Sequence, residues 1–182
     1  CPVAVDAIEL SGRYTNLFFH TESLLNQKQT GDLNRLRLRA EDRFDQFSWE
    51  LVYDHSWLYG RVVRSAQYQA ASSLPYPTYL DPTSYIYRGH SLDWRHSLYR
   101  GWLQYEQDQL LLTLGRQRIA WGSGRIWNPT DRFNPIDPTA VEQDQKIGVD
   151  AFNTAWRYDN SGSFQMILAP GRSEHNVARK VA

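Results

Sequence analysis

The chain contains little cysteine, little lysine and no long run of apolar residues. Cys1 is its only cysteine, so a disulfide within the chain is excluded. No stretch of about eighteen apolar residues occurs, and the mean hydropathy is −0.61, so the sequence predicts no transmembrane helix. These absences leave membrane-crossing strands open, because such a strand needs only roughly 9–11 residues, half of them polar.

Net charge and catalytic motifs are also absent. The 20 basic and 20 acidic residues cancel, which gives no electrostatic case for a nucleic-acid partner. The basic charge is almost all arginine, since Lys28, Lys146 and Lys180 are the only lysines. Neither a nucleophile elbow nor a phosphate-binding loop occurs, and the scattered histidines match no known metal-ligand spacing. We therefore expect no enzymatic activity, no cofactor and no metal site.

Residues 1–7 combine a cysteine with small residues. They fit the remnant of a signal peptide cleaved near Ala4 or Ala7. A lipidated Cys1 is the alternative, for which Pro2 is an unusual neighbour. The whole of residues 1–182 is otherwise expected to form a single domain.

What the sequence does contain is alternation, seen most clearly over residues 33–54. One set of alternating side chains is apolar and aromatic: Leu36, Leu38, Ala40, Phe47, Trp49, Leu51 and Tyr53. The intervening set is polar or charged, apart from Val52. Successive side chains of a strand point to opposite faces, so this pattern predicts two strands with one apolar and one charged face. A transmembrane β-barrel and a soluble antiparallel sheet with one wet face both have this arrangement.

Reading the same alternation along the chain predicts seven strands. They lie at about 7–19, 33–44, 46–56, 95–106, 109–120, 149–158 and 162–169. Tight turns follow the second, fourth and sixth strands, and the longer connections cover 20–32, 57–94 and 121–148. Short turns at one end and long loops at the other are typical of outer-membrane barrels. The expected fold is therefore an all-β, antiparallel transmembrane β-barrel, and the odd strand number makes this the N-terminal portion of a larger one.

The inward face of such a barrel would carry the function. The pore-lining residues expected from alternation are Arg13, Arg35, Arg37, Arg39, Glu41, Arg43, Glu50, Asp54, Arg100, Gln104 and Arg157. They could form a network of arginine–carboxylate pairs that stiffens the wall, with Arg39 and Glu50 pairing across the hairpin. Alternatively, the arginines could favour anions in a pore.

A segment after the fifth expected strand resembles a known family. The matching residues are Gly115-Arg116-Gln117, Trp121-Gly122, Asn128-Pro129, Asp131 and Phe133-Asn134-Pro135. The segment is similar to porin-like outer-membrane barrels of Gram-negative bacteria, which include uncharacterised families and the alginate-export type. The resemblance implies localisation in the outer membrane and passage of small solutes.

The same segment has a physical interpretation of its own. Gly122 and Gly124 permit unusual backbone angles, and Pro129 and Pro135 prevent regular strand pairing. A short helix is expected over 138–146, inside a loop that either narrows the lumen or braces the rim.

We therefore expect an outer-membrane, porin-like channel for small polar or anionic solutes, with the lipid bilayer as its partner. A polysaccharide export barrel and a soluble carbohydrate-binding β-sandwich are the alternatives. The oligomeric state stays open.

Overall fold

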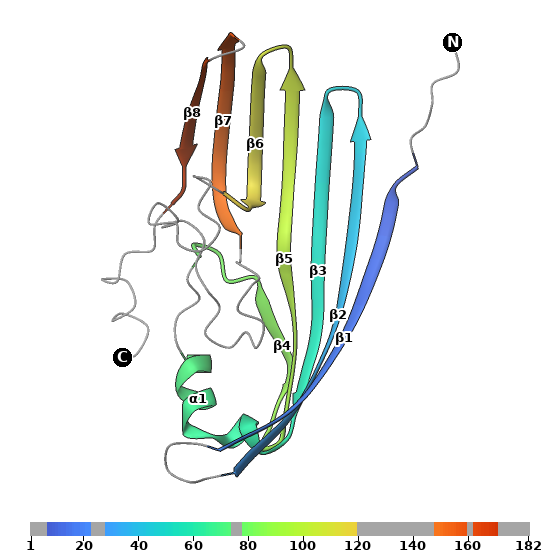
Figure 1. The fold of residues 1–182 in the computed structure, drawn as a ribbon, viewed down its shortest axis with the longest axis vertical. Coiled ribbons are helices and arrows are strands. Elements are labelled where there is room, and N and C mark those ends of the chain that lie inside the picture. The colour runs from blue at the N-terminus through green and yellow to red at the C-terminus, as the bar shows by residue number, and fades with distance from the viewer. Residues whose placement is uncertain (1–6, 23–27, 74–77, 120–147, 160–161, 171–182) are drawn as a thin grey trace.

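The computed structural model of the chain describes residues 7–22, 28–73, 78–119, 148–159 and 162–170. Its strands form one antiparallel sheet in the order β1-β2-β3-β5-β6-β7-β8, with β4 paired beside β5 (Figure 1). The strands are β1 (Glu9–Glu22), β2 (Lys28–Phe44), β3 (Phe47–Tyr59), β4 (Thr83–Arg88), β5 (Leu92–Gln107), β6 (Leu110–Gln117), β7 (Val149–Asp159) and β8 (Gly162–Leu168). The 3-10 helix η1 (Arg61–Arg64) and the helix α1 (Ala66–Ser73) follow β3. The expectation of an all-β antiparallel fold is confirmed.

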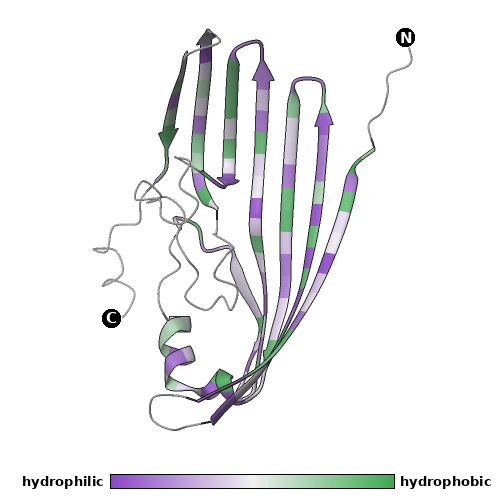
Figure 2. Cartoon of the chain, viewed as in Figure 1, coloured by the Kyte–Doolittle hydropathy of each residue, from purple (hydrophilic) through white to green (hydrophobic). Residues whose placement is uncertain are grey.

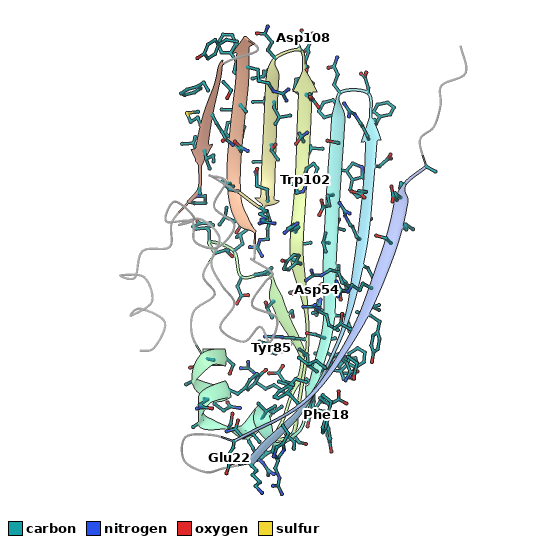
Figure 3. All side chains as sticks on the ribbon, viewed as in Figure 1. Phe18, Glu22, Asp54, Tyr85, Trp102 and Asp108 are labelled. Carbon is teal, nitrogen blue, oxygen red and sulfur yellow. The ribbon has the colours of Figure 1, made fainter. Side chains whose placement is uncertain are left out.

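Two short turns lie at the same end of the sheet. Asp45 joins β2 to β3 and Asp108 joins β5 to β6, with positive φ angles of 53° and 51°. Aspartate tolerates this left-handed conformation, which tight hairpin turns require. Asp108 and Glu22 mark opposite ends of the sheet (Figure 3), and the connection that follows β3 leaves near the end that carries Glu22. β6, in contrast, ends partway along the sheet, where Arg116 lies level with Leu51, and the short connection from β4 to β5 lies near the Glu22 end. The expected separation of short turns from long connections therefore holds only in part among the described residues.

The strand register places charged and apolar side chains on opposite faces. Arg37 lies opposite Asp54, and the next residues along the strands, Leu38 and Tyr53, lie opposite one another. We call the face of Arg37 and Asp54 the charged face and the face of Leu38 and Tyr53 the apolar face. Figure 2 shows the resulting alternation of hydrophilic and hydrophobic residues along the strands.

Large apolar side chains are exposed rather than buried. The buried apolar residues among those described are Val52, Leu58, Val63, Ile119, Val149 and Ala151. The apolar face, in contrast, exposes Leu10 at 75%, Leu114 at 61% and Phe164 at 58%, together with many others. The sheet is therefore apolar on a face that no described element covers.

The connection between β3 and β5 departs from the expectation. Residues 57–94 were expected to form one long loop, but they contain η1, α1 and β4 as well as the ends of β3 and β5. The described sheet consequently has eight strands instead of the expected seven. β4 pairs with β5 between Asp93 and Ser97, on the edge that β6 occupies further along, from Gly101 onwards. β4 has six residues and lies beside the row of consecutive strands. A strand this short is too brief for alternation alone to reveal it.

Gly60 turns the chain sharply after β3. Its φ angle is +126°, and a Cβ atom there would lie 2.4 Å from the carbonyl oxygen of Thr30. Its N–H donates to the carbonyl of Ser91 at 2.9 Å. The turn sends η1 over the charged face, where Val62 packs beside Gly31 and Phe19. None of the described helices is long and apolar enough to cross a membrane.

Candidate functional site

The charged face holds most of its arginines and its glutamates in different rows of the register. Six arginines occupy three adjacent rows of the register, and we call them the arginine band: Arg13, Arg35, Arg37, Arg39, Arg95 and Arg100. One row nearer the short turns, Glu9 lies opposite Glu41, and Glu41 lies opposite Glu50. The arginine band therefore lies farther from the short turns than the three glutamates, and Arg43 lies one row nearer the turns than they do.

Arg37 is the most completely paired member of the band. Its Nε and Nη2 atoms donate to the two carboxylate oxygens of Asp54 at 2.6 and 2.5 Å. The guanidinium lies 3.7 Å from the ring centroid of Tyr99, a cation–π contact. Both ends of the pair are mostly shielded from solvent, so Arg37 and Asp54 hold β2 and β3 together rather than offering a free charge.

Tyr99 reaches the charged face because β5 contains a bulge. The alternation of residues 95–106 places Tyr99 with Gly101 and Leu103 on the apolar face. In the structure, Val52 pairs with Arg100 while Tyr53 pairs with Leu98, so Tyr99 is an extra residue. A bulge reverses the facing of the residues beyond it, which is why Arg95 and Arg100 share one face.

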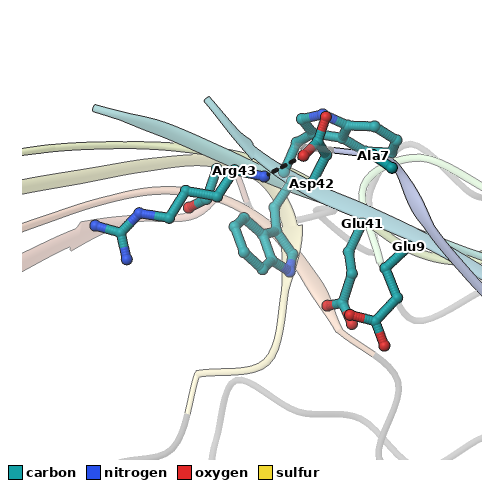
Figure 4. Close-up of a pocket in the computed structure, with 8 residues that line it drawn as sticks. Ala7, Glu9, Glu41, Asp42 and Arg43 are labelled. Carbon is teal, nitrogen blue, oxygen red and sulfur yellow. Dashed lines mark hydrogen bonds between the residues drawn. The ribbon is translucent and has the colours of Figure 1, made fainter. Parts of the chain in front are cut away.

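Arg39 forms ion pairs with two glutamates. It lies 2.7 Å from the Glu41 carboxylate and 3.3 Å from that of Glu50, which confirms the expected Arg39–Glu50 pair. Glu9 and Glu41 direct their carboxylates to the same side of a cavity of about 410 Å³ (Figure 4). The same cavity is bounded by the Asp42–Arg43 backbone, where the Arg43 N–H donates to Asp42 Oδ1 at 2.7 Å. One arginine thus partly neutralises two of the three carboxylates in the glutamate row.

Three further arginines of this face, Arg13, Arg100 and Arg157, have no carboxylate partner within the described residues. Arg13 and Arg157 are exposed and form no ion pair there. Arg100 lies 5.2 Å from the Tyr99 ring, and its Nε is buried without a hydrogen-bond partner among the described residues. All eleven side chains expected to line a pore fall on this one face by register. They therefore share one face, although Arg37, Asp54, Arg39, Glu41 and Glu50 are ion-paired with one another on it.

Arg116 organises a second polar cluster on the edge of β5. The cluster lies where the first residue of β4 and the last residues of β6 approach one another along that edge. Arg116 is only 3% exposed. Its Nε and Nη2 donate to the carboxylate of Asp150 at 2.9 and 2.8 Å. Nη2 also donates to Thr78 Oγ1 at 2.9 Å and to the Leu80 carbonyl at 2.7 Å, and Nη1 donates to the Leu98 carbonyl at 3.3 Å. The side chain supplies donors to backbone carbonyls of β5 and of the segment before β4.

The neighbours of Arg116 are structural as well. Gly115 has a φ angle of +118°, and a Cβ atom there would lie 2.3 Å from the Gly101 carbonyl oxygen. Gln117 donates to the carbonyl of Ala151 at 3.1 Å and accepts from Asn153 at 3.2 Å. The three residues of the Gly-Arg-Gln motif therefore each join β6 to adjacent segments.

The rest of that motif is not described. Trp121, Gly122, Gly124, Asn128, Pro129, Asp131, Asn134 and Pro135 lie outside the described residues, as does the helix expected over 138–146. Asp93 was missed because the expected strand began at residue 95, whereas β5 begins at Leu92. Arg95 was missed because uninterrupted alternation with Tyr99 places it on the apolar face, and the bulge at Tyr99 reverses that facing. Their alternation with Trp94 and His96 was the signal that could have found them.

Comparison with known proteins adds no further assignment. No protein-family model matches the chain, and neither the curated proteins nor the solved structures contain a match.

Proposed function

We propose that this sheet is part of the wall of a transmembrane β-barrel in a Gram-negative outer membrane, through which small polar or anionic solutes pass. The observation that carries the proposal is the exposed apolar face. Soluble monomers rarely expose contiguous apolar patches beyond a few hundred square ångströms. Here the face runs across β1, β2, β3, β5, β6, β7 and β8, with Leu10, Leu38, Leu51, Leu103, Leu114, Trp156 and Met166 among its exposed members.

Aromatic pairs bound this face at both ends. Phe47 and Tyr105 lie 5.0 Å apart near the short turns, and Tyr14 and Trp57 lie 6.4 Å apart toward the long connections. The ten residue steps from Phe47 to Trp57 span about 33 Å along a strand at roughly 3.3 Å per residue. At a tilt of roughly 45° this covers about 23 Å, close to the roughly 25 Å apolar band of outer-membrane barrels.

The apolar face becomes polar at the second aromatic boundary. Asn16 donates to Asp32 at 2.7 Å and to Asn34 at 2.9 Å, on the same face as Tyr14 and Trp57. A hydrogen-bonded network of amides and a carboxylate suits the headgroup region or water better than hydrocarbon. Its position therefore supports a membrane boundary near Trp57.

The charged face then borders water inside the barrel. Its arginine band contains six guanidinium groups, of which Arg37 is paired with Asp54 and Arg39 with Glu41 and Glu50. Positive side chains in a pore attract anions and raise the barrier to cations. Arg13, which is exposed and forms no ion pair with the described residues, supports small anionic solutes as the preferred cargo.

Barrel closure requires further pairing at the sheet edges. β1 and β8 lie at opposite edges of the described sheet. An unpaired edge in hydrocarbon leaves backbone groups unsatisfied, which costs several kcal/mol per group. We infer that strands other than those described here pair with these edges.

Cysteine labelling on β1 tests the proposal. In a Cys1→Ser background, Leu10→Cys lies on the apolar face and the adjacent Ser11→Cys on the charged face, and both wild-type side chains are exposed. In liposomes, a charged maleimide should label Ser11→Cys and not Leu10→Cys, while a lipophilic maleimide should label Leu10→Cys. Equal labelling of the two positions by the charged reagent would contradict a lipid-facing apolar face.

Detergent extraction separates the channel from a soluble carbohydrate-binding sandwich. All eight described strands belong to one sheet, whereas a sandwich needs a second sheet over the apolar face. A sandwich should stay in the aqueous phase after cell lysis, and a barrel should require detergent for extraction.

A further inference from the structure

The end of the sheet that carries the long connections contains a basic pocket. Its volume is about 450 Å³, and it is lined by Lys28, Gln29, Arg61, Arg64 and Ser65. We propose that this pocket binds phosphate-type oxyanions. Binding itself needs no pore, and only its role as a capture step for solutes rests on the proposed function.

The charge of the lining residues carries the proposal. Lys28, Arg61 and Arg64 are cationic, and no carboxylate lines the pocket. None of the three forms an ion pair with another described residue; Glu22 lies opposite Lys28 in the register, but no ion pair joins them. Three cations around one concave site, without an ion-pair partner among the described residues, attract a multivalent anion, and arginine suits the geometry of phosphate oxygens.

The wall that supplies the two arginines is rigid. Val63, between Arg61 and Arg64, is fully buried, and its carbonyl accepts from Gln69 Nε2 at 2.6 Å. Gly60 fixes the entry of the segment through its close contact with Thr30. The arginine backbones are therefore held in place before an anion arrives, which lowers the entropic cost of binding.

The start of α1 adds a weaker contribution. Ser65 lines the pocket, and its hydroxyl accepts from the Tyr68 N–H at 3.2 Å, which makes it the cap of the helix. The positive end of the helix dipole consequently lies at the pocket wall, where it favours a negative charge.

The phosphate-type oxyanion that this pocket would bind has two possible sources. A phosphate-type oxyanion could belong to a dissolved solute on its way to the arginine band or to the headgroup of a membrane lipid. The pocket lies at the end of the sheet opposite the short turns, together with η1, where either source could reach it.

Binding measurements on the full chain in zwitterionic detergent test the proposal. One arm titrates inorganic pyrophosphate by calorimetry, and the other titrates micelles that contain a bisphosphorylated lipid. The pocket variant is Arg61→Gln/Arg64→Gln. The matched control is Arg118→Gln/Arg157→Gln, which removes the same charge from two exposed arginines outside the pocket that form no ion pair with the described residues. Circular dichroism confirms that each variant is folded.

We expect the pocket variant to weaken binding about tenfold or more and the control to change it less than about twofold. Added salt should weaken binding by the wild type, because the pocket is open to solvent. An effect in the pyrophosphate arm identifies a dissolved anion, and an effect in the lipid arm alone identifies a headgroup. No wild-type binding in either arm, or equal weakening in the control, would overturn the proposal. Cysteine labelling on β1 is independent of these results, so failure of the pocket and failure of the channel are distinguishable.

Discussion

Arg116 carries a full charge that is buried in the sheet. Hydrogen bonds from its guanidinium to Asp150, Thr78 and the Leu80 and Leu98 carbonyls compensate that burial. Replacing it with alanine leaves the Asp150 carboxylate and the Leu80 and Leu98 carbonyls without their donor. Removing one member of a buried ion pair typically costs about 3–5 kcal/mol. We expect Arg116→Ala to lower the free energy of unfolding by about this amount in urea titrations followed by tryptophan fluorescence.

The control for Arg116 is Arg157→Ala. Arg157 lies on the charged face, is exposed and forms no ion pair with the described residues. Its replacement should change stability by no more than about 0.5 kcal/mol. Similar losses in the two variants would mean that Arg116 has no special structural role.

Gly115 offers a second test at the residue scale. Its backbone has a positive φ angle, and an added Cβ would collide with the Gly101 carbonyl oxygen. Backbone strain of this kind costs about 1–3 kcal/mol, so Gly115→Ala should lower the urea midpoint clearly. Gly12→Ala on β1 is the control, because its Cβ would meet only ordinary contacts at 3.4 Å and beyond. A neutral Gly115→Ala would contradict the close approach of β5 and β6 seen here.

At the scale of elements, α1 is attached to the sheet through Tyr68. Its hydroxyl donates to Asp93 Oδ2 at 2.7 Å, and Asp93 is only 2% exposed. Burial raises the pKa of Tyr68 above its usual range, so the phenol keeps its proton and remains a donor. Tyr68→Phe removes a hydrogen bond to a charged group, worth about 1.5–3 kcal/mol. We expect α1 to open more often, with hydrogen exchange in Ala66–Ser73 accelerated about tenfold or more.

Tyr79→Phe serves as the comparison for Tyr68. Tyr79 is 55% exposed, and its hydroxyl has no hydrogen bond among the described residues. Its replacement should leave exchange in α1 unchanged. If Tyr68→Phe also left it unchanged, the hydrogen bond to Asp93 would not be what docks the helix.

The seven strands that lie side by side from β1 to β8 could be predicted from alternation. The elements that depend on partners distant in the sequence could not. β3 was expected at 46–56 and runs from Phe47 to Tyr59. It could be predicted because apolar and polar side chains alternate from Phe47 to Leu51. β2 begins at Lys28 instead of 33, since its first residues are polar on both faces. That part lies beyond the Trp57 boundary, where a proposed membrane strand needs no apolar face.

The candidate site shows the same division. The facing of Arg37, Arg39 and Glu50 followed from period-two alternation, and so did the Arg39–Glu50 pair. The cluster at Arg116 brings together Thr78 and Asp150, which lie 38 and 34 positions away along the chain. Nothing local to residue 116 encodes those partners. The bulge at Tyr99 was likewise invisible, because it inserts one residue without a glycine or proline to mark it.

Across the whole molecule, apolar and charged side chains occupy opposite faces of the sheet. Large apolar side chains are exposed on one face, and the Arg37–Asp54 and Arg39–Glu50 ion pairs lie on the other. The charged face is also layered, with the glutamate row nearer the short turns than the arginine band. A pore with this wall would carry opposite potentials at two depths, and ions would meet them in sequence.

The ion preference of the complete protein in planar bilayers tests which arginines set that potential. Arg13→Gln removes a cation that has no carboxylate partner among the described residues, so it should reduce the preference for anions. Arg37→Gln should do the same, because it exposes the charge of Asp54. The double variant Arg37→Gln/Asp54→Asn removes one positive and one negative charge that lie within hydrogen-bond distance. It should therefore restore the wild-type preference.

Reversal potentials measured in a salt gradient at low ionic strength provide the readout, because screening is then weakest. The single and double variants at Arg37 share the loss of the Arg37–Asp54 bond, so a structural effect would appear in both. Recovery in the double variant alone identifies net charge on this face as the cause. If Arg13→Gln and Arg37→Gln both left the reversal potential unchanged, the arginine band would serve the wall of the barrel and not the selection of solutes.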